Sequence, residues 1–275
     1  MLSYLASRPA DACTVSEIAN VLSLPRATCD TLLLALTDRG FVRRDRDRRY
    51  TLGGTCIALG DAARVANPSL RSAAIAAERL AHSLGAFVAV SIRDATQTRV
   101  VQAFDHGPPL GLRARLGEAI TLAPPFGATF IAWDDEEAVQ HWLDRADPPL
   151  SSHERATYRT TLRRVHQRGF SVMAVVEGRS TLIDVRAPQA KTKNATKRRD
   201  EAVHDFHQIG EMAAPSRIWV AQVSAPVFGI SEAVDATLLL LGPNRDLTEA
   251  QVSLLGQQVM QAAKAASSAL PEAAP

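Results

Sequence analysis

Two groups of polar side chains have types and spacings that could hold a metal ion. His204 and His207 are three residues apart, with Glu201 and Glu211 nearby, so one helix face could present all four side chains. The simpler interpretation is a solvated polar face, and we predict neither a metal site nor a cofactor. The acidic run at residues 134–137 stands at an expected helix start, where its charge complements the helix dipole without any catalytic role.

Catalytic motifs are missing from the sequence. It contains no GxSxG, HExxH, P-loop or GxGxxG pattern. The three cysteines, Cys13, Cys29 and Cys56, lie far apart and form no CxxC pair, which argues against a disulfide framework and a structural zinc site. Cys29 could be oxidised, but the favoured interpretation is a small, buried apolar residue. We therefore predict that the protein is not an enzyme.

Arginine gathers in one short segment, residues 43–49, which holds five arginines and two aspartates. Such a cluster is typical of contacts with DNA phosphates or with a minor groove. A hairpin kept in solution by its charge is the alternative interpretation. The net charge of the whole chain is only +2, so the chain as a whole is not a polycation.

Length and composition bound the class of protein that positions these residues. The chain has 275 residues, 46% of them apolar and 22% charged, which is typical of a globular protein with one large or two ordinary domains. No apolar run approaches the roughly 18 residues of a transmembrane helix. Residues 1–10 lack the basic and apolar segments of a signal peptide. We expect a cytoplasmic protein with no membrane partner.

The first 53 residues have the pattern of a winged helix-turn-helix. Thr14 and Glu17 have the spacing of a capping box before a short helix. Pro25 suits the first turn of the next helix, which we expect to run to residue 38, with Leu32, Leu33 and Leu36 in the core. Two short β segments around the arginine tip follow. A helix of this kind enters a major groove with its N-terminal half.

The rest of the chain reads as a linker helix and a second domain, so the fold class is α+β. We expect the linker over residues 54–68 and the second domain, a mixed sheet flanked by helices, over residues 69–270. Candidate strands include residues 110–116, 217–224 and 234–241, and a candidate helix covers residues 124–133.

The order and spacing of short motifs resemble the IclR family of bacterial transcription regulators. In the first domain the matching segments are TVSEIA at 14–19, LPRAT at 24–28, RGFV at 39–42 and YTLG at 50–53. In the second domain they are LGE at 116–118, LAP at 122–124, APVF at 225–228 and LGP at 241–243. The resemblance thus covers nearly the whole chain.

This resemblance implies a winged helix-turn-helix, a linker helix and a GAF-like α/β effector-binding domain. It also implies homodimers or tetramers that bind palindromic operators in double-stranded DNA. Small organic effectors, often aromatic or carboxylic acids, then alter DNA binding.

Two departures from the family pattern lie in the DNA-binding domain. Thr31 stands where the family usually has an arginine, and Asp30 beside it is unfavourable near phosphates unless it accepts from a cytosine amine. The first helix is also short, because Met1 falls inside the segment where the family's first helix begins. The alternative function is therefore a sensor or interaction protein whose degenerate helix-turn-helix no longer binds DNA.

The predicted site residues fall into two sets. For DNA binding they are Arg26, Thr28, Asp30, Thr31, Arg43, Arg44, Arg46 and Arg48. For effector binding they are Leu112, Pro125, Phe126, Gly127, Gln222, Leu239 and Leu241. This second set is mostly apolar and includes a single amide, so we expect an apolar or aromatic effector rather than a dicarboxylate.

Overall fold

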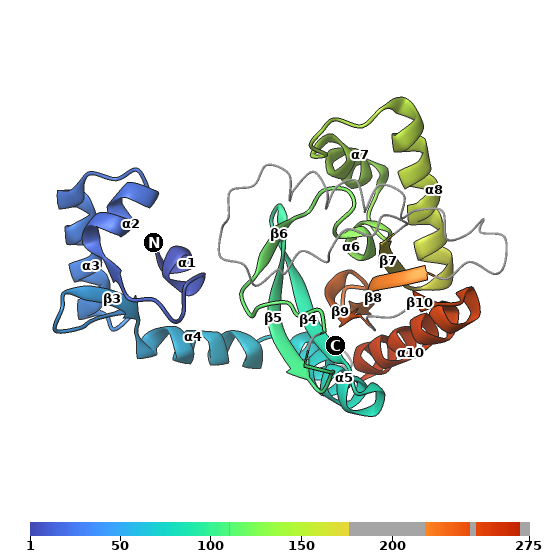
Figure 1. Cartoon of the computed structure of the whole chain (residues 1–275), viewed down its shortest axis with the longest axis horizontal. Helices are drawn as coiled ribbons and strands as arrows, with labels where there is room; N and C mark the ends of the chain where they lie inside the picture. The colour runs from blue at the N-terminus through green and yellow to red at the C-terminus, as the bar shows by residue number, and fades with distance from the viewer. Residues whose placement is uncertain (110, 176–217, 243–245, 270–275) are drawn as a thin grey trace. The chain divides into compact units, whose positions relative to one another are not determined.

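A computed structural model describes residues 1–109, 111–175, 218–242 and 246–269, and the chain divides into two compact units (Figure 1). The first unit is Met1–Pro68 and the second is Ser69–Pro275.

The N-terminal unit has the predicted succession of helices and β-ribbon. Its elements are α1 (Leu2–Ala6), β1 (Cys13–Thr14), α2 (Val15–Val21), α3 (Arg26–Asp38), β2 (Val42–Arg44), β3 (Arg49–Leu52) and α4 (Gly54–Val65). Thr14 and Glu17 form the capping box of α2. The sequence pattern missed β1, which pairs with β3 and makes the ribbon a three-stranded sheet in the order β1-β3-β2. A two-residue strand is too short to show any alternation.

A small core holds α3 against the rest of this unit. Cys29 and Leu33 are buried on the inner face of α3, and Leu36 packs partly against the same cluster. The prediction that Leu32 belongs to the core is wrong, because its side chain is 44% exposed. One residue along a helix turns the side chain by about 100°, so Leu32 cannot share the face of its neighbour Leu33.

The second unit is built on an antiparallel sheet. Its elements are α5 (Pro68–Leu84), β4 (Phe87–Asp94), β5 (Gln97–Asp105), β6 (Ala119–Thr121), α6 (Ala128–Ile131), α7 (Glu136–Asp144), α8 (Ser152–Arg168), β7 (Ser171–Val175), β8 (Ile218–Phe228), β9 (Val234–Leu241), β10 (Asp246–Leu247) and α10 (Glu249–Ser268). The strand order is β10-β8-β9-β4-β5-β6, and β7 also pairs with β8. Every pairing described is antiparallel, so the expected mixed sheet is corrected on this point.

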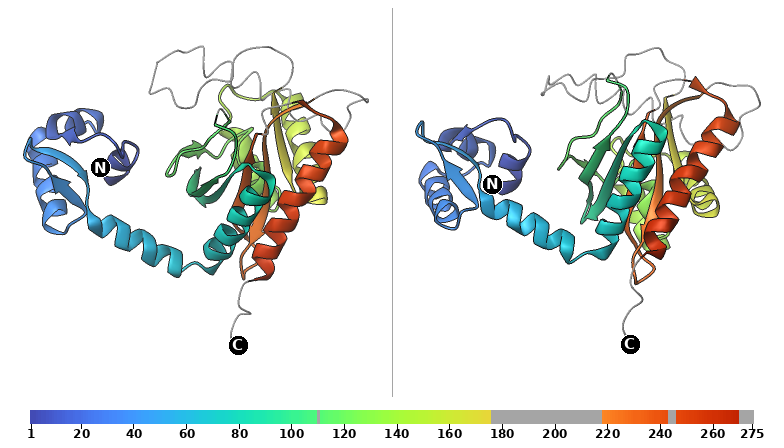
Figure 2. Two further views of the ribbon diagram at one scale, coloured as in Figure 1. Left: turned by 60° about the horizontal axis from the view of Figure 1, so that its bottom comes forward. Right: turned by 90° about the horizontal axis from the view of Figure 1, so that it is seen from below.

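The sheet has helices on both faces. Figure 2 shows α5 and α10 side by side on one face, where their apolar side chains meet those of β4, β8 and β9 in the largest buried cluster. A second cluster joins α6, α7 and α8 around the buried Trp142. The inner strands therefore carry apolar side chains toward α5 and α10, while their alternate positions face α6 and α8.

Two predicted elements before α7 differ in the structure. No strand covers residues 111–116, and the nearest strand is β6. Arg113 instead ties this loop down, since it donates to the carboxylate of Asp105 and, at 2.7 Å, to the backbone oxygen of Pro108. The helix expected over residues 124–133 is reduced to α6, because Gly127 before it adopts φ 84°, which lies outside the helical region.

Candidate functional site

The first turns of α3 present the predicted DNA-binding residues to solvent. Arg26, Thr28, Asp30 and Thr31 are all exposed, while Cys29 between them is buried. The spacing of two apolar residues explains this exposure. Cys29 and Leu33 are four residues apart, so they lie on the same face of α3, and that face packs against the core of the unit. Thr31 turns its hydroxyl back to the helix and donates to the backbone oxygen of Ala27 at 3.0 Å.

Cys29 has a structural role. Its side chain is fully buried and its thiol donates toward the backbone oxygen of Val15 at 3.7 Å, which joins α3 to α2. Burial, and to a smaller extent the charge of Asp30, raises the pKa of the Cys29 thiol. A thiol that stays protonated is a poor nucleophile, so the interpretation as a buried apolar residue is favoured over oxidation.

The wing carries its arginines in two different settings. The Arg44 guanidinium lies over the ring of Tyr50, 5.5 Å from its centroid, and Arg49 donates to the backbone oxygen of Ala12 at 3.0 Å. Arg46 and Arg48 lie in the turn between β2 and β3, both exposed, with no ion pair to any described residue. Arg43 in β2 is exposed in the same way, so exposure leaves all three of these arginines as candidates for contact with a nucleic acid.

A cavity of about 70 Å³ lies in the second unit between the sheet and the helices α6 and α8. Of the predicted effector residues, five line it: Pro125, Phe126, Gly127, Gln222 and Leu239. The backbone oxygen of Phe126 accepts from the Trp142 indole at 2.8 Å, which holds this loop in place.

Two predicted effector residues do not line this cavity. Leu112 lies in the loop that replaces the predicted strand. Leu241 shares a face of β9 with Leu239, and both pack against the small cluster of Phe87, Ala89 and Val100, but only Leu239 also lines the cavity. The prediction that Leu239 and Leu241 lie on one face of the strand is therefore correct, but the cavity does not extend as far as Leu241, the last residue of β9.

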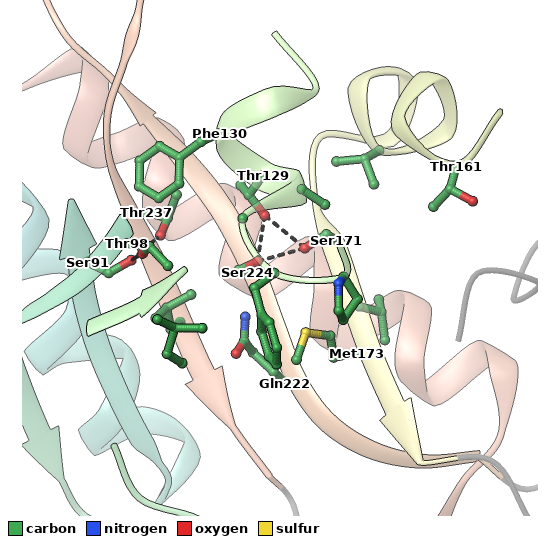
Figure 3. A pocket seen from close by; sticks show the side chains of 18 of the residues that line it. Ser91, Thr98, Thr129, Phe130, Thr161, Ser171, Met173, Gln222, Ser224 and Thr237 are labelled. Carbon is green, nitrogen blue, oxygen red and sulfur yellow. Dashed lines mark hydrogen bonds between the residues drawn. The ribbon is translucent and has the colours of Figure 1, made fainter. Parts of the chain in front are cut away.

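Hydroxyl groups line the cavity more densely than we expected. Thr129, Ser171 and Ser224 form a buried triangle in which each pair of oxygens is 2.6–2.8 Å apart (Figure 3). A second group joins Ser91 to Thr237 at 2.8 Å and to Thr98 at 3.2 Å. The cavity surface is mostly apolar, as predicted, but these six hydroxyl side chains are more polar groups than the few anchors that we expected.

Charged side chains also reach the cavity. Its described lining contains Arg164 and Arg168 from α8 and Glu118 from the loop before β6. Burial, and to a smaller extent the positive charge of Arg164, lowers the pKa of Arg168 to about 10. The Arg168 Nε donates to the backbone oxygen of Phe170 at 2.6 Å.

The sequence contained two signals for the missed residues. Ser171 with Met173, Gln222 with Ser224, and Thr237 with Leu239 occupy alternate positions of three strands, which places each pair on one face. Thr161, Arg164 and Arg168 are spaced by three and four residues on α8, so they share a helix face. Neither pattern says that these faces meet, and only the tertiary structure brings them together.

The acidic run before α7 has a structural explanation. Asp135 caps the helix by accepting from the Ala138 backbone nitrogen at 2.8 Å, and Asp134 forms an ion pair with Arg93. His204, His207, Glu201 and Glu211 lie outside the described residues. Within the part of the chain that is described, no cluster of three or more histidine, cysteine or acidic side chains could hold a metal.

The family model described as the IclR helix-turn-helix domain matches residues 1–46. The chain carries an IclR helix-turn-helix domain. None of the curated proteins compared with this sequence matches it. No described helix is both long enough and apolar enough to cross a membrane.

Solved structures extend the likeness to the second unit. An IclR transcriptional regulator from Alicyclobacillus acidocaldarius is 21% identical, with a TM-score of 0.66 over 97% of this chain and 94% of that one. HmgR from Pseudomonas aeruginosa is 20% identical, with a TM-score of 0.65 and the same coverage. An IclR homolog from Microbacterium hydrocarbonoxydans, complexed with 4-hydroxybenzoate, is 13% identical, with a TM-score of 0.63 over 97% of this chain and 96% of that one.

The chain thus combines an IclR DNA-binding domain with the fold of IclR regulators over nearly its full length. The predicted IclR helix-turn-helix domain and the α+β fold class are confirmed.

Proposed function

We propose that this protein regulates transcription by binding operator DNA, and that a small organic molecule in the cavity of the second unit changes this binding. The observation that carries the proposal is the exposed first half of α3 in an IclR helix-turn-helix domain. Arg26 donates to a guanine or a phosphate, and Thr28 contacts a phosphate or a thymine methyl. Arg46 and Arg48 in the wing contact phosphates or the adjacent minor groove.

The cavity supports a small effector. At about 70 Å³ it is well below the roughly 300–1,000 Å³ of sites that hold drug-sized ligands, so its occupant has few heavy atoms. The relative complexed with 4-hydroxybenzoate supports an aromatic effector. Phe126, Phe130 and Leu239 in the lining provide apolar contacts for such a ring.

The linker helix α4 supports a homodimer or a tetramer. It has no buried residues in the isolated chain, and its Ile57, Leu59 and Val65 side chains are 69%, 54% and 68% exposed. Apolar side chains exposed together on one helix mark an association surface. A two-fold symmetric dimer would place two copies of α3 on the two halves of a palindromic operator.

Selection of bound sites from random DNA tests the DNA-binding part of this proposal. The full chain should enrich a palindromic sequence, and its affinity for that sequence should fall steeply with salt, with a log–log slope of about −0.9 per neutralised phosphate. Failure to enrich any sequence, together with a salt slope near zero, would favour the alternative of a sensor whose helix-turn-helix no longer binds DNA. Asp30 and Thr31, both exposed on α3, are the observations behind that alternative.

A further inference from the structure

We propose that Asp30 is a specificity-determining residue of α3, whose carboxylate accepts a hydrogen bond from the exocyclic amine of a cytosine in the major groove. The inference rests on the proposed function and deepens it, since it names one base that each half of the operator contains. It gives a purpose to a residue that otherwise supports the alternative of a degenerate helix-turn-helix.

The packing of α3 directs Asp30 away from the core. Cys29 and Leu33 are buried and define the inner face of the helix. Asp30 follows Cys29 by one residue, so its side chain points about 100° away from that of Cys29 around the helix axis, and it is exposed. Arg26, one turn earlier, is exposed on the same side of α3. Both residues lie in the N-terminal half of α3, which is the half that enters a major groove in this class of domain.

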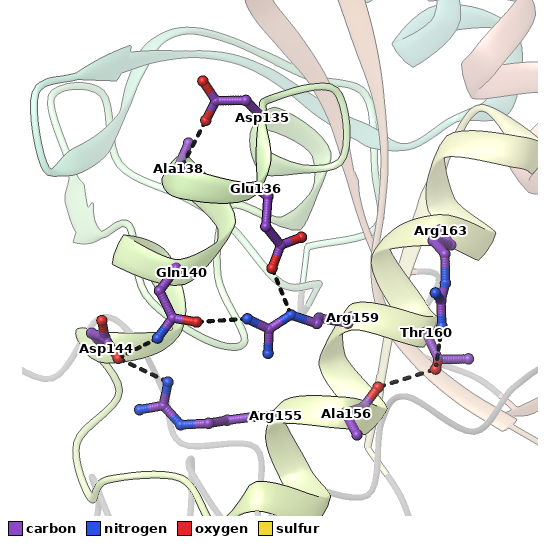
Figure 4. Close-up of polar contacts among 10 residues, drawn as sticks. All are labelled: Asp135, Glu136, Ala138, Gln140, Asp144, Arg155, Ala156, Arg159, Thr160 and Arg163. Carbon is purple, nitrogen blue, oxygen red and sulfur yellow. Dashed lines mark hydrogen bonds and ion pairs between the residues drawn. The ribbon is translucent and has the colours of Figure 1, made fainter.

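The Asp30 carboxylate has no partner within the described part of the chain. It forms no ion pair and accepts no hydrogen bond there. The acidic side chains of α7 show the contrast, since Glu136 pairs with Arg159 and Asp144 pairs with Arg155, each at 2.8 Å (Figure 4). Asp30 is therefore available to accept a hydrogen bond from a molecule that approaches α3.

Electrostatics makes this carboxylate a discriminator between DNA sequences. Double-stranded DNA carries about one negative charge per 1.7 Å of its axis, so a further negative charge in the groove lowers the affinity for DNA in general. An amine that donates to the carboxylate offsets this cost, because hydrogen bonds to ionised groups are roughly twice as strong as neutral ones. Asp30 thus penalises every site that lacks a donor at this position, while the exposed arginines of the domain supply attraction that does not depend on sequence.

The pattern of donors in the major groove selects cytosine. Guanine presents two acceptors there, and thymine presents an acceptor and a methyl group, so neither donates to a carboxylate. Adenine donates from N6 but has the acceptor N7 beside it, which repels a second acceptor, whereas cytosine presents its N4 amine alone. Thr31, the next residue, donates its hydroxyl hydrogen to the backbone oxygen of Ala27 at 3.0 Å, so it adds no donor that would favour guanine or thymine.

Selection of bound sites from a random DNA library, with the full chain as wild type and as Asp30→Asn, tests the inference. The wild type should require a cytosine in each half-site, and any other base there should weaken binding by about tenfold in fluorescence anisotropy at a fixed salt concentration. Asparagine both donates and accepts, and it pairs with N6 and N7 of adenine. Asp30→Asn should therefore move the preference at this one position from cytosine to adenine and leave the other positions as they are.

Asp38→Asn is the matched control, because Asp38 is exposed at the C-terminal end of the same helix and the change removes the same charge. It should leave the selected sequence unchanged. Asp30→Ala should lose the preference for cytosine without gaining one for adenine.

Base preferences that are the same in the wild type and in Asp30→Asn would overturn the inference and leave the proposed function standing. A uniform rise in the affinity of Asp30→Asn for all sequences would also overturn it, because Asp30 would then only repel phosphates. Failure of the wild type to enrich any sequence would contradict DNA binding itself, and the inference with it.

Discussion

Arg26 stands on the first turn of α3 with its side chain exposed, four residues before the exposed Asp30. If it reads a base, Arg26→Ala should weaken binding to the selected operator by about 1–3 kcal/mol and relax specificity at one position. Fluorescence anisotropy with the operator and with single-base variants measures both effects. Arg39→Ala is the matched control, since Arg39 is exposed at the other end of the same helix. Operator affinity that Arg26→Ala leaves unchanged would remove this residue from the interface.

The residue scale also shows why most of the residues that line the cavity escaped sequence analysis. Phe126 and Gly127 were found because a double proline and a glycine mark a turn in any context. Ser224 and Thr237 looked like isolated hydroxyls in apolar strands, and Arg168 looked like an ordinary basic residue at a helix C-terminus. Their importance depends on burial and on neighbours far away in the chain, which local spacing does not encode.

At the scale of elements, the wing should supply a sequence-independent part of DNA affinity. Arg44 and Arg49 are engaged within the unit, whereas Arg46 and Arg48 in the turn are exposed. Alanine at both turn positions should weaken binding to every sequence and reduce the magnitude of the salt slope by about 1.8, at roughly 0.9 per contact. Affinities measured over a salt series test this.

A double variant in the second unit controls for the lost charge. Arg79 and Arg163 are both exposed there, and their replacement by alanine removes the same two charges without touching the wing. The full salt slope should persist in that variant. If the Arg46 and Arg48 variant also keeps it, the wing is only a solvated hairpin.

The capping box of α2 predicts a pH effect on the stability of the N-terminal unit. Glu17 accepts from the Thr14 backbone nitrogen at 2.7 Å, and this bond, followed by the one with the Thr14 side chain, lowers the pKa of Glu17 below its ordinary 4.5. The ionised carboxylate therefore stabilises the folded unit at pH values above 4.5, and this contribution is lost as the pH falls through the lowered pKa.

Glu17→Gln should accordingly weaken hydrogen-exchange protection in α2 and α3 near neutral pH and make no difference in strong acid. Glutamine keeps an oxygen that can accept from Thr14, so the comparison isolates the charge. As a separate check on the cap, Thr14→Ala should cost about 1 kcal/mol of stability. A loss of protection in Glu17→Gln that is the same at every pH would contradict the ionic explanation.

Helices with explicit end signals were predictable, and so were the continuous apolar strands β8 and β9. The capping box at Thr14 predicted the start of a helix, and the structure confirms it. Residues 110–116 were also expected to form a strand, yet the described residues 111–116 form a loop, because Arg113 is tied to Asp105 and Pro108 rather than to a neighbouring strand. Tertiary contacts overrode local propensity there.

At the scale of the whole molecule, the proposed regulation requires that the cavity communicate with DNA binding. Leu239→Trp should fill the cavity, abolish effector binding and leave an operator affinity that no longer responds to the effector. Leu241→Trp is the matched control two residues along the same face of β9, outside the cavity lining. Anisotropy titrations of both variants, with and without 4-hydroxybenzoate, give the answer. A normal response in Leu239→Trp would place the effector elsewhere.

The two units carry different natural reporters. All three cysteines of the chain lie in residues 1–68, where Cys13 and Cys29 are buried and Cys56 is half-buried, whereas Trp133, Trp142 and Trp219 all lie in the second unit. Thiol labelling therefore follows the opening of the DNA-binding unit, and tryptophan fluorescence follows the sheet domain, in one unmodified chain. A variant that no longer binds DNA but keeps both signals native has lost a contact with the DNA. A variant whose Cys29 thiol becomes open to labelling has lost the fold of the DNA-binding unit.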